Sequence, residues 1–121
     1  MSVVVHDFRQ LLVWQRSYRL STQLVDAAGR FKGSARYSLG DQITRSSISV
    51  PSNIAEGAGR GSEREFRRFL GIALGSAYEL ETQVGIARDI GLFDKVRASD
   101  YLSELDEIQR MLHRLRSRPV E

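Results

Sequence analysis

The sequence predicts an all-α fold: an antiparallel, up-and-down bundle of four helices that forms a single domain over residues 1–121. Three observations lead to this prediction. Apolar residues recur at steps of three and four along four segments, which is the period of a helix and not of a strand. Glycines separate these segments, as Gly29 and Gly33, then Gly57, Gly59 and Gly61, then Gly91. Because the links are short, consecutive helices are expected to pack as antiparallel neighbours.

The first two predicted helices each carry one apolar seam. The seam of the first helix consists of Val13, Ser17, Leu20, Leu24, Ala27 and Phe31. The second helix keeps this spacing across a proline, through Leu39, Ile43, Ser46, Val50 and Ile54. Pro51 lacks a backbone N–H and clashes with the preceding turn, so we expect helix two to be kinked, or split near Ser47 to Val50.

The third helix is predicted to be the longest. Ser62 and Glu65 form a capping box, in which each side chain satisfies a free backbone N–H at the helix start. Seven residues then follow at heptad spacing, Phe66, Leu70, Ala73, Ala77, Leu80, Val84 and Ala87. With a stop at Gly91 after Ile90, the helix would be about 43 Å long.

The fourth helix has two candidate starts, Asp94 and Ser99. Its apolar stripe consists of Leu102, Leu105, Ile108, Leu112 and Leu115. Acidic residues lie early in this segment and basic residues late, an order that the helix dipole favours.

Composition excludes several classes of protein. Apolar residues make up 41% and charged residues 27% of the chain, which excludes a disordered protein. The chain has no cysteine, so disulfides, thiolate metal sites and cysteine nucleophiles are excluded. His6 and His113 have no ligand-like neighbours. We therefore expect no metal, no cofactor and no catalytic residue, and hence a protein that is not an enzyme.

The apolar run at the amino terminus, Val3 to Val5, is too short for a signal peptide. No stretch approaches ~18 apolar residues, so we expect no membrane partner and a cytoplasmic location.

Two groups of arginines are candidates for contacts with RNA or DNA. Of the eighteen basic residues, sixteen are arginine, against fifteen acidic residues, and the net charge is +3. One group surrounds the start of helix three and the other ends helix four: Arg60, Arg64, Arg67, Arg68, and Arg110, Arg114, Arg116, Arg118. An alternative needs no ligand, because Glu56, Glu63 and Glu65 can pair with the first group and the helix dipole accounts for the second.

Polar and apolar residues beside the seams are candidates for contacts between helices or between subunits. Asn53, Glu56, Ser76, Glu79 and Gln83 lie close enough to a core to need polar partners, so an inter-helix or inter-subunit network is expected. Helix three also carries a second apolar stripe, of Phe69, Ile72, Ile86 and Ile90. A single bundle covers one face of each helix, so this stripe predicts a homo-oligomer.

The middle of the chain resembles a known bacterial family. The run from Ser46 to Arg60 reads SSISVPSNIAEGAGR, and the match continues through residues 65–66, 69–70, 72–73, 75–76 and 79–83. Upstream, LVWQ at 12–15 and YSL at 37–39 also match. These motifs are similar to those of the four-helix-bundle proteins encoded in intervening sequences of 23S ribosomal RNA genes. The chain departs from the family pattern at Thr44-Arg45-Ser46-Ser47, where the family often has two arginines followed by two alanines, and at Phe31-Lys32, where Phe-Pro is common.

The resemblance implies a four-helix bundle that assembles into a ring, a pentamer, with no catalytic activity. Related bundle proteins are accessory partners of reverse transcriptases and bind nucleic acid. Together with the arginines, this predicts a non-enzymatic oligomer that binds RNA or DNA through arginine surfaces pooled from several subunits. The alternative is a scaffold that binds another, unidentified protein and does not bind nucleic acid.

Overall fold

The computed structural model describes residues 7–118, and these contain four α-helices and no strand. The helices are α1 (Leu12–Gly29), α2 (Asp41–Ala58), α3 (Glu63–Asp89) and α4 (Lys95–Ser117). A single 3-10 turn (η1, Phe8–Gln10) precedes α1, and a turn of π-helix (η2, Arg36–Gly40) leads into α2. The all-α prediction is therefore confirmed. The run Val3 to Val5 and His6 lie outside the described residues.

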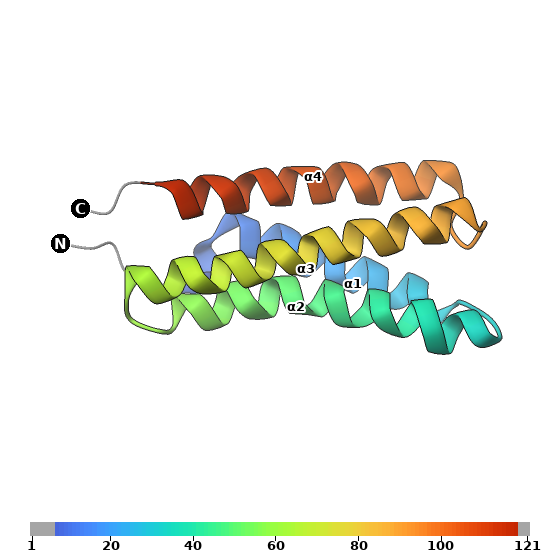
Figure 1. Cartoon of the computed structure of the whole chain (residues 1–121), viewed down its shortest axis with the longest axis horizontal. Coiled ribbons are helices and arrows are strands. Elements are labelled where there is room, and N and C mark those ends of the chain that lie inside the picture. Colours follow the sequence, from blue (N-terminus) through green and yellow to red (C-terminus); the bar gives the residue numbers. More distant parts are fainter. Residues whose placement is uncertain (1–6, 119–121) are drawn as a thin grey trace.

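The four helices pack as a bundle. α1 contacts α2 and α4, and α3 also contacts α2 and α4. Figure 1 shows the links α1–α2 and α3–α4 at one end of the bundle. The α2–α3 link lies at the other end, together with the last turns of α4; this end is called the α2–α3 end below.

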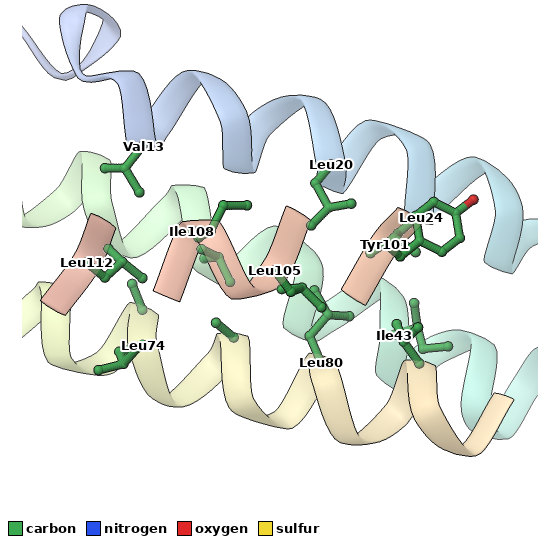
Figure 2. Close-up of a cluster of buried hydrophobic side chains, with 14 of the residues drawn as sticks. Val13, Leu20, Leu24, Ile43, Leu74, Leu80, Tyr101, Leu105, Ile108 and Leu112 are labelled. Atoms are coloured by element: carbon green, nitrogen blue, oxygen red, sulfur yellow. The ribbon is translucent and has the colours of Figure 1, made fainter. Parts of the chain in front are cut away.

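The core contains the predicted seams. All six residues of the first predicted seam are buried, five of them in α1 and Phe31 just after it, and all seven of α3 are buried. On α2 and α4 the seams are buried apart from Leu39, Leu102 and Leu115, which are partly buried at their margins. Figure 2 shows side chains from all four helices meeting along the bundle axis. Each fully buried leucine or isoleucine contributes about 1.5–3 kcal/mol, so these seams supply most of the driving force for folding.

Side chains cap the two long helices. The Ser62 hydroxyl accepts the backbone N–H of Glu65 at 3.1 Å, while the Glu65 carboxylate pairs with Arg68. α4 begins after Asp94, whose carboxylate accepts a backbone N–H of the first turn at 2.8 Å, so Asp94 is the start and Ser99 is not. After α3, Gly91 has φ +84°, a left-handed conformation that favours glycine.

Helix α2 continues across Pro51, so the predicted alternative of a split helix is wrong. The proline removes one helical hydrogen bond, but Val50, Pro51 and Ile54 are all buried. Burial on both sides of the proline outweighs the lost hydrogen bond and keeps the segment helical. The kink at Pro51 stays a prediction.

Candidate nucleic-acid interface

The structure brings the first group of arginines together with Arg116 and Arg118 of the second group at the α2–α3 end. The first turns of α3 lie beside the last turns of α4, and their side chains interact directly. The Arg118 guanidinium lies 3.3 Å from the Glu63 carboxylate, and the Arg67 guanidinium donates to the backbone carbonyl of Arg118. Two segments that are 48 residues or more apart in sequence thus form one surface, called the arginine end, of Arg60, Arg64, Arg67, Arg68, Arg116 and Arg118.

Glu63 is the acidic centre of this surface. Only 5% of its side chain is exposed, and it lies between Arg118 and the Arg67 Nε, which is 3.7 Å away. That Nε is buried and has no hydrogen-bond partner among the described residues. A carboxylate in the first turn of a helix is also stabilised by the helix dipole. Glu63 therefore ties the last turn of α4 to the first turn of α3.

Phe69 lies under the arginine end. Its ring is 6% exposed, and the guanidinium carbons of Arg60 and Arg68 lie 4.9 Å and 4.7 Å from its centroid. Arg60 is held by Glu56 at 2.6 Å and Arg68 by Glu65 at 3.1 Å. Phe69, predicted as a contact with another copy, is thus covered by arginines of its own chain.

The remaining arginines lie along α4. Arg110 binds Asp106 at 2.9 Å, and this hydrogen bond raises the pKa of Arg110 above its ordinary value. Arg114 binds Glu107 at 3.3 Å and lines a small cavity beside the start of α1. The Arg116 guanidinium lies against Gly71 of α3, where a Cβ would come within 3.1 Å of it.

Charge is in excess at this end of the molecule. Six of the eight predicted arginines have a carboxylate partner. Within residues 7–118, Arg64 and Arg116 make no ion pair. The six arginines of the arginine end share three carboxylates, those of Glu56, Glu63 and Glu65, so this surface retains three uncompensated positive charges.

The predicted polar residues form contacts between α2 and α3. The Ser49 and Ser76 hydroxyls are hydrogen-bonded at 2.7 Å, and Asn53 donates to the Ser49 hydroxyl at 2.9 Å. Ser46 donates to the side-chain oxygen of Gln83. Glu79 lines a polar groove of about 360 Å³ beside this network. Glu56 is not part of the network, because it points to Arg60.

Two apolar surfaces are exposed on different helices of the bundle. One is the α3 ridge, of Ile72, Ile86 and Ile90. The other is the α1–α2 groove, of about 640 Å³, lined among others by Trp14, Tyr18, Ile48, Pro51 and Ala55. The sequence interpretation missed this groove as a site. The spacing of Trp14 and Tyr18, an aromatic pair one turn apart whose ring centroids are 5.0 Å apart, was the available signal.

Two further observations concern metal ligands and membrane-spanning segments. Among residues 7–118, no three histidine or acidic side chains are grouped as metal ligands. In the same range, none of the helices combines the length and apolarity that crossing a bilayer requires.

The chain is similar to known proteins over nearly its whole length. The family model for the 23S rRNA-intervening sequence protein matches residues 9–114. A crystal structure from Bacteroides thetaiotaomicron VPI-5482, of a protein with unknown function from the S23 ribosomal protein family, superimposes with a TM-score of 0.80. The two chains share 20% identity, and the match covers 88% of this chain and 100% of the other, which shows a common fold. No curated protein matches the sequence. The motifs around SSISVPSNIAEGAGR and the family model agree: the chain belongs to the 23S rRNA-intervening sequence protein family.

Proposed function

We propose that the protein is a non-enzymatic homo-oligomer that binds RNA or DNA in the cytoplasm through the arginine ends of several subunits. The observation that carries this proposal is the meeting of α3 and α4 around Glu63, which makes one basic surface from two distant segments. Guanidinium groups without a carboxylate partner attract the phosphates of a nucleic acid, and their binding releases the cations that surround those phosphates.

Affinity would come from several subunits together. Three uncompensated charges on one subunit give weak binding, since each phosphate contact contributes only a small electrostatic term. Linked copies of the same surface bind far more tightly than one, provided that a single nucleic-acid strand reaches them all. The proposal therefore requires an oligomer that presents its arginine ends on one side.

The two apolar faces support such an oligomer. The α3 ridge and the α1–α2 groove consist of different residues on different helices, so a contact between them is heterologous. Heterologous contacts form a ring when the rotation between neighbours closes after one full turn, and an open filament when it does not. A ring holds the same end of every subunit on the same side. The family resemblance implies five subunits.

Two finer features of the fold belong to this proposal. The alternation of the links between the two ends of the bundle supports the antiparallel order of the helices (Figure 1). Pro51 lies in the wall of the α1–α2 groove, where a kink in α2 would shape the surface that receives the α3 ridge.

A salt series with matched variants tests nucleic-acid binding. Arg64→Gln together with Arg116→Gln removes the two arginines that lack a carboxylate partner among the described residues. We expect weaker binding of RNA and DNA. In a plot of log affinity against log salt concentration, the negative slope should become less steep by about 1.5–2 for each subunit engaged. The control is Arg36→Gln with Arg97→Gln, which changes the net charge equally but lies toward the opposite end. Equal effects of the two double variants would refute the arginine end as the binding surface.

Native mass tests the ring. Ile86→Asp on the α3 ridge and Ile48→Asp in the α1–α2 groove should each reduce the oligomer to monomers in light scattering, and each should also weaken nucleic-acid binding. Val96→Asp, at another exposed apolar residue, is the matched control and should leave the mass unchanged. A monomeric wild-type protein would refute the oligomer.

A scaffold that binds another protein is the second candidate function. It is favoured by the carboxylate partners of six of the eight arginines, which reduce the charge available to phosphates. An intact oligomer that binds neither RNA nor DNA at low salt would favour this candidate.

A further inference from the structure

We infer that the outer face of α3 and α4, next to the arginine end, binds single-stranded nucleic acid by stacking a base on Tyr78. This inference rests on the proposed function and adds the class of nucleic acid and the residue that selects it. Tyr78 lies on α3 with 45% of its side chain exposed, beyond the core that the bundle buries.

A hydrogen bond to α4 orients the Tyr78 ring. Its hydroxyl and the Nε2 atom of His113 on α4 are hydrogen-bonded at 2.9 Å. The two ring centroids are 6.5 Å apart and the planes are inclined by 50°, so the imidazole does not stack on the phenol ring. An aromatic side chain that is already oriented loses little conformational entropy when it binds a partner.

Arg64, Gly71 and Tyr78 lie seven residues apart on α3, and therefore on one face at intervals of about 10 Å. At the middle position, Arg116 of α4 occupies the space that a side chain at Gly71 would fill. Gly75, between Gly71 and Tyr78, leaves the surface open, since a Cβ there would meet nothing within 4 Å. Two guanidinium groups and an aromatic ring thus follow one another along a shallow surface.

These groups fit a single strand better than other anions. Arginines bind the phosphates of any nucleic acid, but a base is free to stack on a tyrosine only where it is not already stacked within a duplex. An acidic peptide would use Arg64 and Arg116 but has no need of Tyr78. Two carboxylates of α3 and α4 already have partners, because Glu81 accepts from Gln109 at 2.8 Å and Asp106 binds Arg110.

The test compares a labelled single strand, oligo-dT or oligo-rU, with a duplex of the same length by fluorescence anisotropy. We expect Tyr78→Ala to weaken single-strand binding by roughly 5- to 150-fold and to leave duplex binding within about twofold. Tyr78→Phe keeps the ring and should retain most of the single-strand affinity. Tyr37→Ala removes an exposed tyrosine outside this face and serves as the matched control.

The outcomes separate this inference from the proposed function. If the wild-type protein binds both ligands with a steep salt dependence and Tyr78→Ala changes neither, the stacking site is wrong and the proposed function stands. An equal loss on single strand and duplex also overturns the stacking site. If the wild-type protein binds neither ligand at low salt, both proposals fail. Melting curves of each variant show that a loss of affinity does not come from unfolding.

Discussion

Gly57 of α2 lies directly against α3, and replacing it with alanine is expected to destabilise the bundle. A Cβ at this position would lie 2.6 Å from the Cβ of Phe69 and 3.3 Å from the carbonyl oxygen of Phe66. Non-bonded carbon atoms pack at about 3.5–4.0 Å, so the two helices would have to separate by about 1 Å. Neither Cβ is able to rotate away, because both are attached to helical backbone.

The expected loss follows from two opposing effects. Overpacking a core costs about 1–3 kcal/mol, and the rigid contact at Gly57 places this variant near the upper value. Alanine favours the helix over glycine by about 1 kcal/mol, which offsets part of the cost. We therefore expect Gly57→Ala to lower the free energy of unfolding by about 2 kcal/mol.

Urea unfolding followed by circular dichroism measures this change. Gly75→Ala is the matched control, since it is also a helical glycine but has open space around it, and it should stabilise the protein by about 0.5–1 kcal/mol. All variants are compared at one protein concentration, because an oligomer is stabilised by mass action. If Gly57→Ala were as stable as the wild type, the close approach of α2 and α3 at Gly57 would be refuted.

Three further predictions concern side-chain interactions. Glu63→Gln should lower the free energy of unfolding by about 1–3 kcal/mol. The loss is smaller than for a fully buried ion pair, because the two arginine partners of Glu63 are each 30% exposed. The variant should also bind nucleic acid more strongly, because it lacks a carboxylate in the arginine end. Weaker binding at unchanged stability would contradict this. Ser76→Ala leaves the Ser49 hydroxyl without its partner on α3 and should lower the free energy of unfolding, measured by thermal unfolding, by about 1 kcal/mol. An unchanged stability would show that water replaces the hydrogen bond. The hydrogen bond and charge of Arg88 lower the pKa of Asp89, so its ionised form stabilises the fold at neutral pH and this contribution is lost as the pH falls below about 4. Asp89→Asn should therefore show a smaller loss of stability between neutral and acidic pH in urea titrations, and an unchanged pH profile would contradict the assignment.

The sequence alone predicted the features that depend on residues close together in the chain. The capping serine Ser62, the buried seam of α3 and the ion pair from Glu63 to Arg67 each involve positions three, four or seven residues apart. Such pairs meet in any α-helix, whatever the helix packs against, so local spacing is sufficient to predict them. At Pro51 the same reasoning left a kink or a split open, and the structure excludes the split, because the burial of the residues around the proline keeps α2 continuous.

The tertiary structure alone decided which distant side chains meet. Glu63 and Arg118 are 55 residues apart, and Tyr78 and His113 are 35 apart, yet both pairs are in contact. Periodicity shows which face of a helix is buried, but the rotation and the axial position of each helix against its neighbours depend on how all the core side chains fit together. For that reason only the tertiary structure shows three features: the arginine end, the covering of Phe69 by arginines, and the α1–α2 groove.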